Sequence, residues 1–275
     1  MKKNCFYRSF GFIMVLVFSL SMIITNPVSA QEEKNKQNST NIMMPANMVL
    51  SGMQSLTESH LKAVEHNLTM TRKSLNMMMD SKEDKSIDWK TVKPLLKEAE
   101  MLSVPAVYWF ANPDGSYYTV DKDKTDQSLK DRDYFPKVLK GEDIFGALVV
   151  SHSTGKKSVI IAKPLKIDDK VIGVLGASVF LEDLNELIKI QMAFTDKDLF
   201  FVLDENGETV LNWKSDRILK YPEKMGDVSL ADAVKNMMKM DEGIVMYSYK
   251  DKERKVQFLK SPMTGWRYAL GHMEN

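Results

Sequence analysis

The clearest pattern of apolar positions in the chain has helical spacing and covers Ala46–Asp80. Apolar residues there are separated by alternating steps of three and four, which places them on one stripe of a helix. They are Leu61, Val64, Leu68, Thr71, Leu75 and Met78. At 1.5 Å per residue the helix reaches about 52 Å, which is longer than a small domain, so it should run along more than one module. A second helical segment up to residue 100 starts after Asp88, a suitable N-cap, and is expected to kink or restart at Pro94.

After residue 104 the spacing between apolar positions shortens, which predicts strands. Asn112 and Gly115 belong to a turn between an apolar run and its partner strand, and Gly141 ends a short helix. The predicted elements are strands at 104–110 and 116–120, a helix at 131–140, and strands at 145–151, 157–165 and 171–180. Residues 121–126 are interpreted as a solvated loop, because this acidic stretch lacks the central glycine and final glutamate of a calcium loop.

The order of these elements repeats. Gly115 and Gly207 occupy the same place in two similar hairpins that lie 92 residues apart. The second set contains a helix at 230–240 and strands at 243–249, 255–260 and 266–271, and a helix over Leu181–Gln191 joins the two sets. The sequence therefore predicts an α+β fold in which a long N-terminal helix is followed by two tandem modules, each an antiparallel sheet flanked by helices.

The first 30 residues have the anatomy of a signal peptide. A short basic start precedes an apolar run at 10–24, and small residues end the segment at Ala30, so cleavage is expected there. The alternative is an uncleaved membrane anchor, although Pro27 stops the helix short of a bilayer's thickness. Residues 31–45 are expected to form a flexible lead-in. No second apolar stretch of spanning length follows, so a periplasmic or secreted protein is predicted.

Net charge and cysteine content exclude several classes of function. The chain has a net charge of +1, and loss of the three basic residues of the leader changes it to −2. Such a chain has no positive field for nucleic acid. The one cysteine, Cys5, lies in the leader, which excludes a disulfide, a thiol nucleophile and a thiolate metal site from the mature chain.

Catalytic and metal signatures are poor. Ser178 follows Gly176 but lacks the second glycine of a nucleophile elbow, and His60 and His66 are not spaced to share a metal ion on a helix. The 20 methionines, some clustered as at 77–79, favour adaptable core packing, with copper(I) capture as the alternative. We expect no enzyme activity, no resident metal and no cofactor.

Several short motifs in this order resemble the double Cache sensor domain. They are Asp131-Arg132-Asp133-Tyr134-Phe135, Lys163-Pro164-Leu165, residues 171–176 and Leu181-Glu182-Asp183-Leu184. Domains of this family are the extracytoplasmic ligand-binding modules of bacterial chemotaxis receptors and sensor kinases. Over residues 46–272, the resemblance implies two PAS-like lobes on the long helix. The membrane-distal lobe, residues 101–180, would bind the ligand, and residues 181–198 would link it to the second lobe at 199–275.

The resemblance also implies a binding site. Arg132 matches an arginine that grips the ligand carboxylate, Tyr134 and Phe135 stand where an aromatic pair is found, and Ser178 replaces an aspartate that holds an ammonium group. An organic acid is therefore favoured over an amino acid. From spacing alone, Arg132 could instead pair with Asp131 or Asp133.

Four further residues sit at strand ends of the same lobe. Tyr118, Ser151, His152 and Lys163 are candidates for the same pocket, although a turn histidine is usually solvated. Arg217, in the second module, is expected to take no part in binding.

The sequence thus favours an exported sensor module. It would bind a small organic acid and signal through a partner such as a membrane receptor or a sensor kinase, because no second span or kinase segment occurs before Asn275. The alternative is a periplasmic carrier or scavenger that feeds a transporter, and a methionine-based copper chaperone is a third hypothesis.

Overall fold

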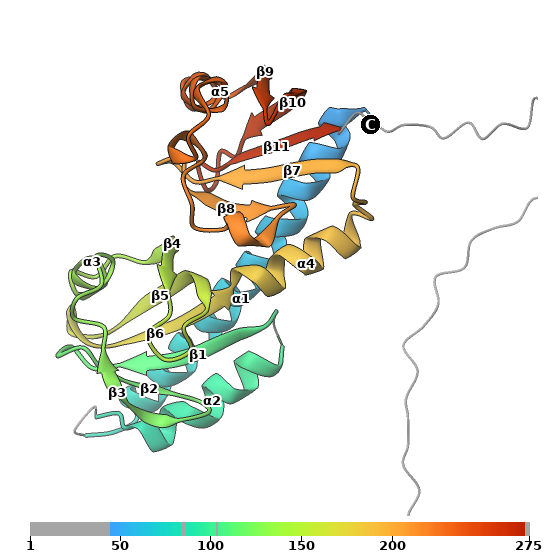
Figure 1. Cartoon of the computed structure of the whole chain (residues 1–275). Coiled ribbons are helices and arrows are strands. Elements are labelled where there is room, and N and C mark those ends of the chain that lie inside the picture. The colour runs from blue at the N-terminus through green and yellow to red at the C-terminus, as the bar shows by residue number, and fades with distance from the viewer. Residues whose placement is uncertain (1–44, 84–85, 103, 273–275) are drawn as a thin grey trace, which may run out of the picture. The chain divides into compact units, whose positions relative to one another are not determined.

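The computed structural model describes residues 45–83, 86–102 and 104–272 (Figure 1). The predicted signal peptide and its cleavage point at Ala30 lie outside these residues, as does the lead-in before Pro45. Among the described residues, no helix is both long and apolar enough to cross a membrane.

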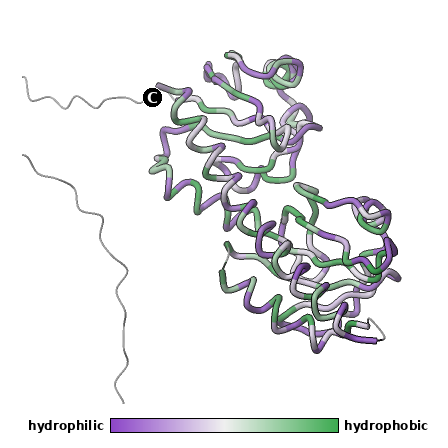
Figure 2. The backbone as a smooth tube through the Cα atoms, turned by 180° about the vertical axis from the view of Figure 1, so that it is seen from behind, coloured by the Kyte–Doolittle hydropathy of each residue, from purple (hydrophilic) through white to green (hydrophobic). Residues whose placement is uncertain are grey.

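The long helix α1 covers Ala46–Asp80, as predicted. Its buried residues recur every three or four positions, and Figure 2 shows the resulting alternation of hydrophobic and hydrophilic segments along it. Thr57 and Thr71 lie within this stripe, and each hydroxyl donates to the carbonyl four residues earlier, which satisfies it inside the core. The predicted stripe is wrong at its end: Met78 is 40% exposed, and Met79 is buried instead. A step of four from Leu75 continues the stripe there.

The second helix, α2, covers Trp89–Met101 and packs on α1. Asp88 caps it as predicted, because its carboxylate accepts hydrogen bonds from the Thr91 backbone N–H at 2.9 Å and the Thr91 hydroxyl at 2.7 Å. The helix continues through Pro94 without a break, so the predicted restart there does not occur.

The first sheet contains six antiparallel strands in the order β3-β2-β1-β6-β5-β4. Its strands are β1 (Ala106–Ala111), β2 (Ser116–Thr119), β3 (Asp123–Ser128), β4 (Ile144–Val150), β5 (Lys157–Ile167) and β6 (Lys170–Phe180). One face packs against α1 and α2, and the short helix α3 (Phe135–Leu139) covers the other. Gly115 makes the β1–β2 turn with a φ of +89°, a conformation that favours glycine.

Two predictions for this region are wrong. The stretch interpreted as a solvated loop is mostly strand β3, an exposed edge strand whose polar sequence carries no apolar alternation. The helix expected at 131–140 begins only at Phe135, so Arg132 lies in a turn before it.

The second sheet has five antiparallel strands in the order β8-β7-β11-β10-β9. Its strands are β7 (Asp198–Leu203), β8 (Thr209–Asn212), β9 (Glu242–Tyr249), β10 (Lys252–Lys260) and β11 (Arg267–His272). Apart from the extra edge strand β3, both sheets have the same order of equivalent strands, which confirms the predicted repeat. The helix α4 (Leu181–Gln191) precedes this sheet. The 3-10 turns η2 (Ser215–Arg217) and η3 (Pro222–Lys224) and the helix α5 (Val228–Met238) follow β8.

Buried side chains form three clusters. The largest follows α1 and includes the inward face of both sheets, for example Leu175 of β6 and Phe200 of β7. A second cluster joins the other face of the second sheet to α5, and a third joins the other face of the first sheet to α3. Each sheet is therefore covered on both faces, and the faces turned away from α1 are where the sites described below lie.

Candidate functional site

Arg132 lies at the edge of the first sheet, in the turn between β3 and α3. Its backbone N–H donates to the Leu129 carbonyl at 3.0 Å, and its own carbonyl accepts from the Phe135 N–H at 2.9 Å. The guanidinium Nη2 donates to the Val150 carbonyl at 2.6 Å, which ties this turn to the end of β4. Within the described part of the chain, Arg132 forms no ion pair with Asp131 or Asp133, the alternative considered from the sequence.

Ser151 and His152 follow Val150 and lie beside Arg132 in the fold. Nδ1 of His152 is 3.1 Å from the Ser128 carbonyl, and because a carbonyl only accepts, this nitrogen carries the proton. Its Nε2 is 3.8 Å from Asp131 Oδ2. Ser151 is buried, with its N–H bonded to the Lys156 carbonyl at 2.8 Å. Three predicted site residues therefore gather at one end of the sheet.

Tyr134 and Phe135 form the wall next to Arg132. Both are buried in the cluster under α3, on the same sheet face as Trp109 and Tyr117. Burial raises the pKa of the Tyr134 hydroxyl well above its ordinary value, although the charge of Arg132 opposes the rise. The phenol therefore stays protonated and keeps its hydrogen-bond donor at physiological pH.

Ser178 belongs to the same face of the sheet. Its Oγ accepts a hydrogen bond from Trp109 Nε1 at 3.1 Å, and both side chains are buried. The indole lies over Gly176, where a Cβ atom would come within 2.1 Å of the ring. Trp109 and Tyr117 were not predicted as site residues, although their alternation along β1 and β2 is the signal that would have placed them on this face.

Two predicted site residues lie on the opposite face. Tyr118 stacks on Trp89 of α2, with ring centroids 5.3 Å apart. Lys163 is 3% exposed, and its ammonium contacts Asp143 Oδ2 at 2.7 Å and Glu65 Oε1 at 2.9 Å, so it fastens the sheet to α1. Neither side chain faces the cluster under α3, because neighbouring residues of a strand point to opposite faces and a position at a strand end does not decide which face.

The other chemical candidates are not assembled into a site. Within residues 45–83, 86–102 and 104–272, there is no cluster of three or more histidine, cysteine, aspartate or glutamate side chains placed to hold a metal ion. Met77 is 73% exposed whereas Met79 is 2% exposed, so these two methionines of the cluster point to different sides of α1.

Comparison with known proteins identifies the fold. The family model described as Cache domain matches residues 46–273. No curated protein is similar enough in sequence to match the chain.

Solved structures of low sequence identity share the fold. The periplasmic sensory domain of the Campylobacter jejuni chemoreceptor Tlp1 has a TM-score of 0.62 at 11% identity, covering 83% of this chain and 94% of that one. The ligand-binding domain of the Pseudomonas fluorescens chemoreceptor CtaA, solved with L-alanine, has a TM-score of 0.58 at 14% identity, covering 82% and 97%. An extracellular ligand binding receptor from Desulfohalobium retbaense has a TM-score of 0.62 at 12% identity, with 82% of this chain covered. The match spans 40% of that receptor's length.

Proposed function

We propose that this chain, which belongs to the Cache domain family, is an exported sensor module that binds a small carboxylate and signals through a partner protein. The family and the fold shared with chemoreceptor sensory domains support a ligand-binding sensory role. Export by a signal peptide cleaved after Ala30 and the receptor, kinase or transporter that responds are parts of the same proposal.

Arg132 is the observation that carries the proposal. The side chain is half-buried against Tyr134, and one of its nitrogens is held by the Val150 carbonyl. A guanidinium has five N–H donors in a planar fork, so donors remain for a carboxylate after this bond is made. Because no carboxylate of the described residues pairs with it, an acidic ligand would supply the missing counter-charge.

The preference for an acid over an amino acid rests on Ser178. The residue stands where the family's aspartate would hold an ammonium group, and its Oγ accepts from Trp109 instead. Among the described residues, the cluster under α3 contains no buried acidic side chain. An ammonium group on this face would therefore lose its hydration without gaining a charged partner. CtaA, which was solved with L-alanine, makes amino acids the class to test against.

The test is calorimetric titration of the full-length protein with two- to four-carbon carboxylic acids and the common L-amino acids. Arg132→Ala is expected to weaken binding of the best acid by roughly 30-fold to several thousand-fold, because the bound carboxylate would be buried without its partner. Lys137→Ala is the matched control. Lys137 is an exposed cation of α3, and its loss removes the same charge outside the site.

Circular dichroism would establish that each variant is folded. Unchanged affinity in folded Arg132→Ala would show that the ligand does not bind at this site. Tighter binding of an amino acid than of its deaminated analogue would contradict the preference for an acid.

A further inference from the structure

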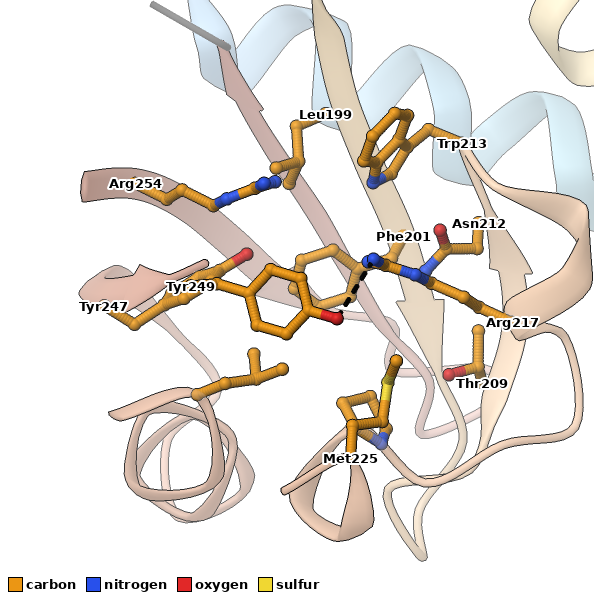
Figure 3. A pocket seen from close by; sticks show the side chains of 12 residues that line it. Leu199, Phe201, Thr209, Asn212, Trp213, Arg217, Met225, Tyr247, Tyr249 and Arg254 are labelled. Atoms are coloured by element: carbon orange, nitrogen blue, oxygen red, sulfur yellow. Dashed lines mark hydrogen bonds between the residues drawn. The ribbon is translucent and has the colours of Figure 1, made fainter. Parts of the chain in front are cut away.

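A second pocket lies in the other lobe, on the face of the second sheet turned away from α1. Strands β7 to β10, both 3-10 turns and α5 contribute to its wall, and Figure 3 shows their side chains around one space. Phe201 and Thr209 of this pocket stand 92 positions after Trp109 and Tyr117 of the first lobe. The repeat thus places the two sites on equivalent strands, and a smaller side chain stands at each position in the second lobe.

The charged side chains that line this pocket are all positive. Arg217 of η2 and Arg254 of β10 both line it, and no lining residue is acidic. Neither guanidinium forms an ion pair with any carboxylate of the described residues. Two like charges that share a partly dehydrated space repel each other, and a bound anion would relieve the repulsion.

Aromatic rings hold the two guanidiniums in place. Cζ of Arg217 is 5.2 Å from the ring centroid of Tyr249, and Cζ of Arg254 is 5.4 Å from the same centroid. Arg217 also lies 5.5 Å from the centroid of Trp213. Cation–π contacts fix the position of a guanidinium but leave its N–H groups available to an acceptor. The contact between Arg217 Nη2 and the Tyr249 hydroxyl is 3.5 Å, a long hydrogen bond that a better acceptor would replace.

Two polar atoms of the lining lack a partner. Nε of Arg254 and Oγ1 of Thr209 are buried and make no hydrogen bond within the described residues, and Thr209 is 0% exposed. Buried polar atoms are nearly always satisfied, so a donor and a hydroxyl left open at one pocket indicate a ligand or water there. Burial raises the pKa of the Tyr247 hydroxyl, although the charges of both arginines and a hydrogen bond with the Arg254 side chain oppose the rise, so this phenol stays protonated.

We propose that this pocket is a second ligand site, which binds a short aliphatic monocarboxylate between Arg217 and Arg254. The remaining lining includes Leu199, Met225 and Leu230, an apolar surface suited to a short alkyl group rather than to a second charge. The cavity has a volume of about 20 Å³, room for about one water molecule, so the carboxylate would displace Arg217 from the Tyr249 hydroxyl as it enters. This inference is independent of Arg132.

The test uses propionate and the indole N–H signal of Trp213 in the nuclear magnetic resonance spectrum of the full-length protein. Trp213→Phe assigns the signal among the chain's four tryptophans. Propionate is expected to shift it saturably, whereas chloride at equal ionic strength and inorganic phosphate are not. Arg217→Gln and Arg254→Gln should each weaken the binding by about 30-fold or more. Lys255→Gln, an exposed neighbour of Arg254 that points to the other face, should leave it unchanged.

Arg132→Ala separates this site from the one in the first lobe. The Trp213 shift should survive that substitution at full affinity, whether or not the first lobe binds an acid. Where a glutamine variant fails to fold, Arg254→Lys retains the charge without the planar fork and should still bind more weakly. An unmoved Trp213 signal, an equal response to chloride or phosphate, or wild-type affinity in both folded glutamine variants would overturn the proposal.

Discussion

The buried indole of Trp109 donates a hydrogen bond to the buried Ser178 Oγ across the β1–β6 pair, at 3.1 Å. Ser178→Ala is expected to destabilise the protein by about 1–3 kcal/mol, because the buried N–H would lose its acceptor while keeping the cost of dehydration. Urea unfolding would measure the loss. Ser178→Cys has a weaker acceptor of similar size, so its stability should lie between those of wild type and Ser178→Ala. Equal stability of all three proteins would mean that the hydrogen bond contributes nothing.

Gly176 is required by the position of the same tryptophan. Gly176→Ala should destabilise strongly, because the added Cβ would come within 2.1 Å of the Trp109 ring. Gly52→Ala in α1 is the matched control: its Cβ would meet only the flexible Met192 side chain at 3.4 Å. That change should stabilise by about 0.5–1 kcal/mol through helix propensity. Thermal unfolding of both variants tests the contrast, and similar shifts of the same sign would contradict it.

The buried ammonium of Lys163 depends on two half-exposed acids. Replacing both by amides, as Glu65→Gln with Asp143→Asn, would leave it without a counter-charge and should cost about 3 kcal/mol or more. Lys163→Met should cost less, because it removes the buried charge and leaves acids that water can reach. Denaturant midpoints of the double amide variant and of Lys163→Met show which change costs more stability. A larger loss in Lys163→Met would show that Glu65 and Asp143 do not stabilise the lysine.

The same network predicts a dependence on pH. Burial alone would raise the pKa of Asp143, but the hydrogen bond and charge of Lys163, together with Arg72, hold it below its ordinary value. A lowered folded-state pKa stabilises the protein above the unfolded value of about 4 and ceases to do so as the pH falls through the folded value. The difference in stability between wild type and Asp143→Asn should therefore shrink on acidification below about pH 4. A constant difference from neutral to acid pH would contradict this.

Docking of α1 can be tested with a pair of aspartates. Leu68 is 0% exposed in the middle of the buried stripe, whereas Met70 is 47% exposed on the same helix. Leu68→Asp should cost several kcal/mol because an unpaired charge would be buried, and Met70→Asp should change stability by at most about 0.5 kcal/mol. Chemical denaturation distinguishes them, and equal midpoints would show that the helix is not packed on the sheets.

The sequence by itself determined the elements whose signal is local. The three-and-four spacing fixed the extent of α1, and Asp88 fixed the start of α2, because helical periodicity and capping depend on near neighbours. The glycine turns at 115 and 207 revealed the repeat that both sheets follow. Strand β3 was missed because an exposed edge strand buries nothing that could impose an apolar pattern.

Tertiary structure decided which residues meet. Alternation along β2 separates Tyr117 from Tyr118, but only the packing of α2 on one face and α3 on the other assigns them to opposite sides of the sheet. Lys163 binds α1 to the sheet through Glu65. Its two carboxylate partners lie 98 and 20 residues away in the sequence, so only the folded chain brings them to the lysine. Arg217 and Arg254 likewise converge only when β10 folds beside β9 and η2 closes over Tyr249. Such contacts join segments far apart in the chain, and no local pattern of residues encodes their distance in space.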